Sequence, residues 1–274
     1  MLTCRRIAYM LVLLTQMHAL AGKSLGLISL FLCCLSLKPD ALDLAPPSGR
    51  MRSLPARTLW VWERRENLCS LDTRTTAIAT LDRTILLGRT VTVIPRRQPI
   101  LYPSGITRIA VIRIEAPGEI GAGLERATAA SILDAATADP TIAALQIDFD
   151  TRHSQRTFYI RLLRDLRRSM PPALPLSITA LASWCSYDDW LSGLPIDEAV
   201  PMFFRMEPDR RLAPPNLPQL RIREPLCSTS IGISTHERHA ESLTGKRLYI
   251  FPDRGWHEDL PLLSESSTTQ RIHP

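Results

Sequence analysis

The sequence predicts an α/β fold, a TIM-type (β/α)8 barrel in which some helices are short or missing. Eight short runs rich in Val, Ile, Leu and aromatic residues recur after residue 57, helical patterns separate several of them, and polar side chains gather where the runs end. Strand–helix–strand alternation requires parallel pairing, and eight such runs in one domain favour closure into a barrel over an open sheet. We therefore expect one barrel domain at residues 58–256.

Short apolar runs bounded by turn residues are typical of strands that are buried on both faces. The predicted strands are Thr58–Glu63, Ile85–Ile94, Ile106–Glu115, Ile142–Asp150, Leu174–Ser183, Ala199–Arg205, Thr229–Ser234 and Arg247–Asp253. Helical patterns are weak in the second, sixth and seventh crossovers. A barrel of about 200 residues is at the low end of the usual range, so some helices must be short or replaced by loops.

The clearest helix follows the fourth strand. Its apolar face repeats at three-to-four-residue spacing, and its opposite face is basic; the two faces consist of Phe158, Tyr159, Leu162, Leu163 and Leu166, and of Arg156, Arg161, Arg164 and Arg167. Such a two-sided pattern predicts a helix that packs on the barrel, and Ser154 is placed to cap its N-terminus. A second helix is predicted from Leu124 to Thr137.

The N-terminus has the pattern of an export signal. Met1–Arg6 is basic, Ile7–Thr15 is apolar and Ala19–Ala21 offers a small-residue cleavage site, while a start at Met17 would make Leu25–Leu37 the apolar region. Both frames predict export to the periplasm or the extracellular space, and the joined runs would also suit an uncleaved membrane anchor. We assign residues 1–37 to a signal peptide or anchor, 38–57 to a linker and 257–274 to a C-terminal tail.

Composition and cysteine usage exclude several classes of function. The net charge of +6 comes from basic residues spread along the chain, without the concentrated stripe of a nucleic-acid-binding protein. Outside the signal region only Cys69, Cys185 and Cys227 remain, which allows at most one disulfide bond, and no pair has metal-ligand spacing. His236 and His239 are too close in sequence for a zinc helix, and the glycines after the third strand do not have the dinucleotide-binding order. No metal or cofactor is expected.

The fourth predicted strand contains the most informative polar residues. Alternate strand residues face opposite sides, so Leu145, Ile147 and Phe149 share one face and Gln146, Asp148 and Asp150 share the other. In a barrel the apolar set packs under the helices, and the polar set points into the barrel near the C-terminal end of the strand, where barrel enzymes place their active sites.

Other strands end in the same way. The third carries Arg113 and Glu115, the sixth ends at Arg205 and the eighth ends at Asp253. Two carboxyl groups on one face of a strand raise each other's pKa in a pocket of low dielectric constant, and a protonated carboxylic acid is what cleavage of a glycosidic bond requires. The alternative is that Arg113 or Arg205 pairs with the acids in a buried network, or that the acids cap the following helix.

Aromatic residues near the predicted strand ends would suit the faces of sugar rings. These residues are Trp60 and Trp62 in the first strand, Trp184 and Tyr187 after the fifth, and Trp256 after the eighth. Tryptophan and tyrosine combine a large apolar face with a polar edge, which suits a partly exposed cleft. Trp62, Trp184, Tyr187 and Trp256 are therefore candidate substrate-binding residues, together with Gln146, Arg113, Arg205 and Asp253.

Three stretches resemble the bacterial family called domain of unknown function 3142. They are Leu145–Asp150 (LQIDFD), Leu176–Cys185 (LSITALASWC) and Asp197–Met206 (DEAVPMFFRM), and the resemblance extends over about Leu59–Trp256. It implies export and a barrel related to glycoside hydrolases, and it supplies no proven catalytic residues.

More distantly, the fourth strand is similar to the D-x-D-x-E motif of family 18 chitinases. Gln146, Asp148 and Asp150 would stand at its three acidic positions, with Asp150 at that of the proton donor. Met202–Arg205 stands where those enzymes have Met-x-Tyr-Asp, so the hydroxyl and carboxylate of substrate-assisted cleavage are absent.

Two functions follow from these residues. The first is an exported glycoside hydrolase-like enzyme acting on a polysaccharide or envelope glycan, with Asp150 as general acid and Asp148 or Glu115 as nucleophile or base. It predicts an open cleft with two carboxylates at the barrel mouth. The second is a non-catalytic glycan-binding or envelope-assembly module, which predicts acids neutralised by arginine and a cleft dominated by aromatic residues. Both predict a carbohydrate ligand and no nucleic acid.

Overall fold

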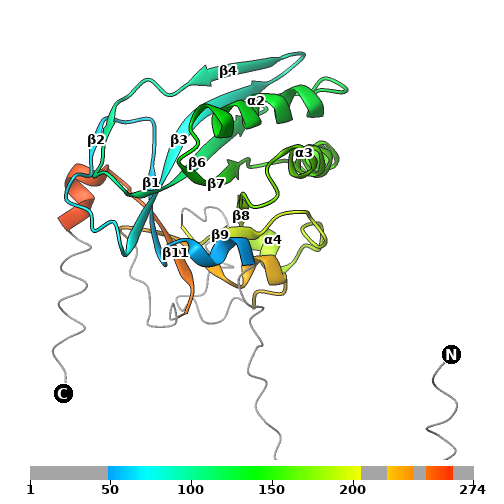
Figure 1. Ribbon diagram of the computed structural model, residues 1–274. Coiled ribbons are helices and arrows are strands. Elements are labelled where there is room, and N and C mark those ends of the chain that lie inside the picture. Colours follow the sequence, from blue (N-terminus) through cyan, green and yellow to red (C-terminus); the bar gives the residue numbers. More distant parts are fainter. Residues whose placement is uncertain (1–48, 205–220, 237–244, 262–274) are drawn as a thin grey trace, which may run out of the picture. The chain divides into compact units, whose positions relative to one another are not determined.

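Eight parallel strands close into a barrel in the computed structural model, which describes residues 49–204, 221–236 and 245–261 (Figure 1). The strands are β1 Arg57–Val61, β3 Thr76–Leu87, β6 Thr107–Glu115, β7 Ile142–Asp148, β8 Leu176–Leu181, β9 Glu198–Met202, β10 Ser230–Ser234 and β11 Arg247–Phe251. They follow one another around the barrel in this order, and β11 pairs with β1 to close it. The predicted barrel is confirmed.

The second predicted strand is wrong in position. Ile85–Ile94 covers the end of β3, a bend at residues 88–90 and most of β4 (Val91–Pro95), which pairs antiparallel with β3. The part of β3 that pairs with β1 is Thr76–Thr80, where Thr and Ala give only a weak apolar pattern. The β3–β4 hairpin is more apolar than Thr76–Thr80, so its sequence gave the stronger strand pattern and was predicted as the second strand. A two-residue pair, β2 (Glu66–Asn67) with β5 (Ile100–Leu101), flanks this region.

Both predicted helices are present. Helix α2 spans Glu125–Ala138 and α3 spans Arg156–Ser169, and Figure 1 shows them along one side of the barrel outside β6 and β7. The other helical pieces in the described crossovers are short: α4 Ala182–Ser186 and the 3-10 turns η2 His153–Gln155 and η5 Pro225–Cys227. A further 3-10 turn, η1 Gly49–Ser53, precedes β1. The expectation of short or missing helices is confirmed, and the first crossover also lacks a helix in its described residues 62–75.

The predicted cap of α3 is wrong. Ser154 lies within the turn η2, and the helix begins at Arg156 without a side-chain cap. The Gln155 side chain makes the hydrogen bonds that hold the start of the helix. Its oxygen accepts from the backbone N–H of Arg152 (3.0 Å), and its amide donates to the carbonyls of Ala116 (3.0 Å) and Gly118 (3.3 Å). Gln155 therefore ties the start of α3 to the loop after β6.

The apolar side chains separate into an interior and an outer layer. Leu145 and Ile147 of β7, and Phe149 directly after it, pack outward against the buried faces of α2 and α3, as the alternation predicts. In the interior, the Trp60 indole N–H donates to the Gln146 side chain (2.7 Å). Because β1 and β7 are not neighbours, this bond crosses the barrel and fixes which faces point inward.

A buried ion pair lies at the N-terminal end of the barrel. Arg247 at the start of β11 donates to Glu198 at the start of β9 (2.7 Å), and the Tyr249 hydroxyl also donates to Glu198 (2.8 Å). Arg247 further donates to the carbonyls of Met51 (2.6 Å) and Pro55 (3.2 Å), so η1 covers this end of the barrel with Met51 buried. Residues 49–57 of the expected linker are thus folded onto the barrel.

The C-terminal end of the described chain packs on the outside of the barrel. Residues 256–261 are helical, and Trp256 is fully buried against β1, β10 and β11. The folded chain therefore continues past Trp256 into the expected tail. The predicted signal region 1–37 and residues 262–274 lie outside the described residues. Within the described part, no helix is long and apolar enough to span a membrane.

Candidate functional site

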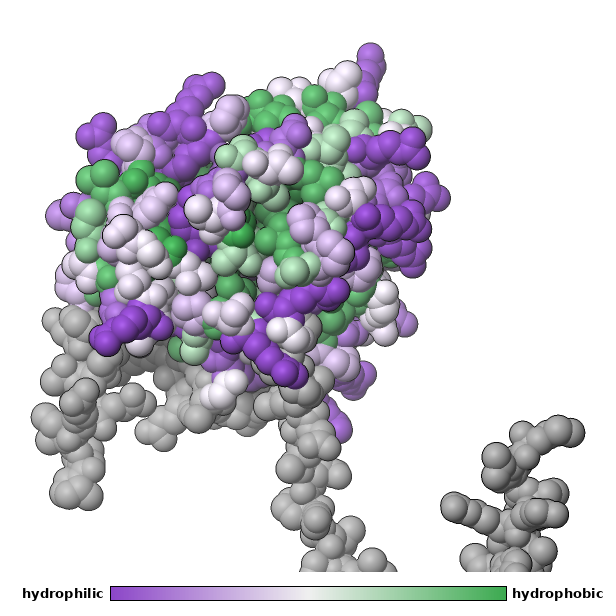
Figure 2. Space-filling model, in the orientation of Figure 1, coloured by the Kyte–Doolittle hydropathy of each residue, from purple (hydrophilic) through white to green (hydrophobic). Residues whose placement is uncertain are grey.

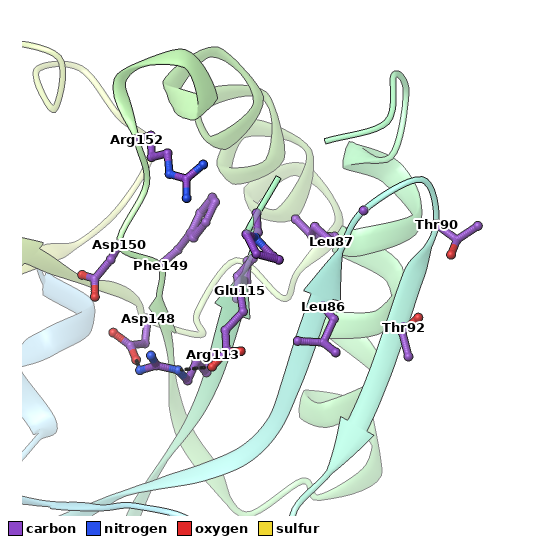
Figure 3. Close-up of a pocket in the computed structure, with 14 residues that line it drawn as sticks. Leu86, Leu87, Thr90, Thr92, Arg113, Glu115, Asp148, Phe149, Asp150 and Arg152 are labelled. Atoms are coloured by element: carbon purple, nitrogen blue, oxygen red, sulfur yellow. Dashed lines mark hydrogen bonds and ion pairs between the residues drawn. The ribbon is translucent and has the colours of Figure 1, made fainter. Parts of the chain in front are cut away.

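Four predicted site residues line one cavity at the C-terminal ends of β6 and β7. The cavity has a volume of about 490 Å³ and is bounded by residues 113–117, 148–150 and 152, and by Leu86, Leu87, Gly88, Thr90 and Thr92 of the β3–β4 hairpin. Arg113 and Glu115 come from β6; Asp148 ends β7, and Asp150 follows two residues later. The parallel register pairs Arg113 with Asp148, which brings the two strand ends together (Figure 3).

Arg113 bridges two of the three acids. Its Nε donates to Glu115 (2.9 Å) and its Nη1 donates to Asp148 (2.9 Å), as the dashed lines in Figure 3 mark. Burial acts to lower the pKa of Arg113, but Asp148, Glu115 and Asp150 outweigh it and raise that pKa, so the guanidinium stays charged. Arg113 therefore interacts electrostatically with all three carboxyl groups of the cluster.

Asp148 is held on both oxygens. Oδ2 accepts from Arg113, Oδ1 accepts from the Thr179 hydroxyl (2.7 Å) on β8, and the residue is buried. Burial raises the pKa of Asp148 despite the opposing effects of Arg113 and Thr179. With both oxygens engaged, Asp148 is suited to positioning Arg113 rather than to direct attack on a substrate.

Asp150 differs from Asp148 in its surroundings. It is exposed at the mouth of the cavity, and in Figure 3 it lies above the Arg113–Asp148 pair. Desolvation nevertheless raises the pKa of its carboxyl group, with Arg113 acting in the opposite direction. A carboxylic acid that keeps its proton to higher pH and still faces open space is able to donate that proton to a ligand.

Gln146 lies beneath the site, fully buried. Its amide donates to Ser177 (3.2 Å) and its oxygen accepts from Trp60, so its hydrogen-bonding groups are used inside the protein. Gln146 was expected among the substrate-binding residues; its burial and its internal hydrogen bonds suit it to supporting the site from below.

Of the predicted aromatic residues, Trp62 lies nearest the site. Its ring is partly exposed, packs 4.4 Å from Trp60 and 6.3 Å from Phe251 between ring centroids, and lies 5.9 Å from the Arg113 guanidinium. A half-exposed ring beside the charged cluster is available to stack on a ligand.

The other predicted binding residues do not line this cavity. Trp184 is buried against Trp190, and Trp256 is buried on the outer face of the barrel, so neither offers a free ring face. Tyr187 is 61% exposed, and Asp253 is exposed at the end of β11, where its backbone N–H donates to Asp259. Arg205 lies outside the described residues.

Sequence reasoning missed three contributors to the site. The alternation of β8 turns Ser177 and Thr179 to the same face, but a small hydroxyl residue on a strand does not by itself indicate a role in a site. Arg152 lines the cavity, and the signal that could have found it is its position two residues after Asp150. The β3–β4 hairpin was missed because its two strands were predicted as one. No cluster of three or more His, Cys, Asp or Glu suited to a metal occurs within the described ranges.

A known protein family matches the part of the chain that contains Arg113 and the three carboxyl groups around it. Residues 105–203 match the family model described as Domain of unknown function (DUF3142). This DUF3142 match includes Arg113, Glu115, Asp148 and Asp150, and it confirms the resemblance over a shorter range than expected. No curated protein matches the chain.

One solved structure resembles the chain weakly. It is the crystal structure of the chitinase domain of the spore coat protein CotE from Clostridium difficile, at 13% sequence identity and a TM-score of 0.37. The match covers 57% of this chain and 52% of that structure, so the chain spans about half of its length.

Proposed function

We propose that this protein is an exported glycoside hydrolase-like enzyme that acts on a polysaccharide or envelope glycan. The observation that supports this best is the Asp150 carboxyl group, whose raised pKa and open position at the barrel mouth suit a general acid. Glu115 is a second exposed carboxyl group in the same cavity. Glycosidases act with two carboxyl groups that flank the bond to be cleaved.

In this proposal Asp150 gives its proton to the glycosidic oxygen as the bond to the anomeric carbon breaks. Glu115 is the partner carboxylate, acting as base toward water or as nucleophile. Only one of its oxygens accepts a hydrogen bond from Arg113, whereas both oxygens of Asp148 are engaged. Asp148 and Thr179 then serve to hold Arg113, which stabilises the negative charge on Glu115. Trp62 is the candidate surface for sugar stacking.

An exported location is supported by the disulfide bond between Cys185 and Cys227. Structural disulfides persist in oxidising compartments and are rare where thiols are kept reduced. The bond agrees with the export signal expected in residues 1–37.

The test is hydrolysis by the purified full chain. Bacterial exopolysaccharides and aryl glycosides are incubated with the parent, with Asp150→Asn and with Asp134→Asn, an exposed carboxylate on α2 that serves as matched control. We expect the parent and Asp134→Asn to release reducing ends and Asp150→Asn to lose at least about a hundredfold in rate. Activity should also fall as pH rises through the raised pKa of Asp150, because the acid then loses its proton.

A second function, glycan binding without catalysis, is favoured by the two ion pairs of Arg113, which engage both Asp148 and Glu115. If no variant releases sugar but the parent retains glycan binding, the hydrolase proposal is wrong and the binding module takes its place.

A further inference from the structure

A groove on the outside of the barrel concentrates arginine side chains between α2 and α3. It has a volume of about 570 Å³ and is lined by Arg126 at the start of α2 and by Arg161, Arg164 and Arg168 of α3, with Glu125 and Asp165. All four arginines are exposed. In Figure 2 hydrophilic side chains gather on the side where Figure 1 places α3.

The groove holds more positive than negative charge. Four arginines face two carboxylates: Arg161 lies 3.7 Å from Glu125, and Arg168 lies 3.2 Å from Asp165. Arg126 and Arg164 have no ion-pair partner among the described residues. Two positive charges are therefore left without a counterion from the part of the chain that the structure describes.

The arrangement of these arginines favours an anionic ligand. Residues 161, 164 and 168 follow the helical repeat and share one face of α3, where like charges repel one another. Arg126 approaches the same space from α2. An anion in the groove would relieve this repulsion, and the planar guanidinium group pairs with carboxylate or sulfate through two parallel hydrogen bonds.

A single loop connects the groove to the candidate site. Ala116 and Pro117 at its start line the site, and Gly123 at its end lines the groove. The loop is held in place because the Gly121 N–H donates to the Gly88 carbonyl (2.8 Å) and Gln155 binds Ala116 and Gly118. Residues 118–122 of this loop therefore join the lining of the candidate site to the lining of the groove.

We propose that the groove binds an acidic polysaccharide whose chain extends from the candidate site. The inference rests on the proposed function in taking a glycan as the ligand, and it adds that the glycan carries carboxylate or sulfate groups. A narrow polymer suits charges that converge within a concave surface, whereas a flat anionic membrane would meet them less well.

The test measures binding of polygalacturonate to the full chain carrying Asp150→Asn, so that no ligand is consumed. Arg126→Glu with Arg164→Glu is compared with Arg65→Glu and Arg97→Glu, two exposed arginines outside the groove, which change the net charge equally. We expect the groove variant to raise Kd at least about tenfold, the control to stay within about twofold, and added salt to weaken binding. Neutral dextran should not respond to the groove variant. Melting curves verify that both variants fold.

Two results would overturn the inference. One is equal affinity of the groove variant and the control for polygalacturonate; the other is tighter, groove-dependent binding to phosphatidylglycerol vesicles, which would indicate a membrane surface. The hydrolase proposal is tested separately by release from neutral aryl glycosides with Asp150 intact. Groove-dependent binding without hydrolysis would leave this inference standing and reject only the catalytic part.

Discussion

At the scale of single residues, the candidate site differentiates three carboxyl groups by their surroundings. Asp148 is buried and bonded to Arg113 and Thr179, Glu115 shares Arg113 at the surface, and Asp150 is exposed without a hydrogen bond to that arginine. Environment, rather than residue type, therefore assigns different roles to two aspartates that are two positions apart.

The pH dependence of stability tests the state of Asp148. Its pKa is higher in the folded protein than the ordinary value of 3.8, so the folded state binds the proton more tightly than the unfolded chain. The free energy of unfolding should then fall as pH rises from about 3.8 through the raised pKa, and Asp148→Asn should remove this part of the decrease. Urea unfolding of both proteins between pH 4 and pH 8 measures the effect.

Asp134→Asn is the matched control and should follow the parent, since Asp134 is an exposed carboxylate on α2 outside the site. Identical pH profiles for Asp148→Asn and the parent would contradict the burial of a proton-binding Asp148.

At the scale of secondary-structure elements, η1 and the starts of β9 and β11 depend on one buried cation. Arg247 contacts Glu198 and the backbone carbonyls of Met51, Leu54 and Pro55, and the Glu198 side chain is completely enclosed. The segment before β1 thereby becomes part of the barrel although its sequence has the composition of a linker.

Arg247→Met should destabilise the protein by about 3–5 kcal/mol, because it leaves the Glu198 carboxylate buried without its partner. Adding Glu198→Gln should restore part of this loss, since the amide is neutral and its oxygen still accepts from Tyr249. Denaturant midpoints of the single and double variants provide the comparison. A double variant as unstable as the sum of both single changes would show that the two residues act independently.

At the scale of the whole molecule, the disulfide bond joins parts that are distant in sequence. Cys185 in α4 and Cys227 in η5 are 42 residues apart, and β9 lies between them. The bond closes a long loop that includes a barrel strand, so its main effect is expected on the unfolded chain.

Replacing Cys185 and Cys227 together by Ser should lower the free energy of unfolding by about 2–4 kcal/mol. Cys69→Ser, which removes an exposed free thiol, is the control and should have little effect. Thermal melts with and without reductant give the measurement, and reductant should reduce the stability of the parent but not of the double variant. A parent that is insensitive to reductant would argue against the bond.

The sequence by itself determined the barrel, seven of its eight strands, both long helices and the inward direction of Asp148 and Arg113. These are local properties, because side-chain alternation in strands and the helical repeat depend only on nearby residues. The tertiary structure alone decided which polar residues meet. Thr179 and Gln146 acquire their roles from partners on other strands, and Trp184 and Trp256 are buried by segments far away in the chain. Contacts between distant residues depend on the register of neighbouring strands and on packing across the barrel, which no local pattern encodes.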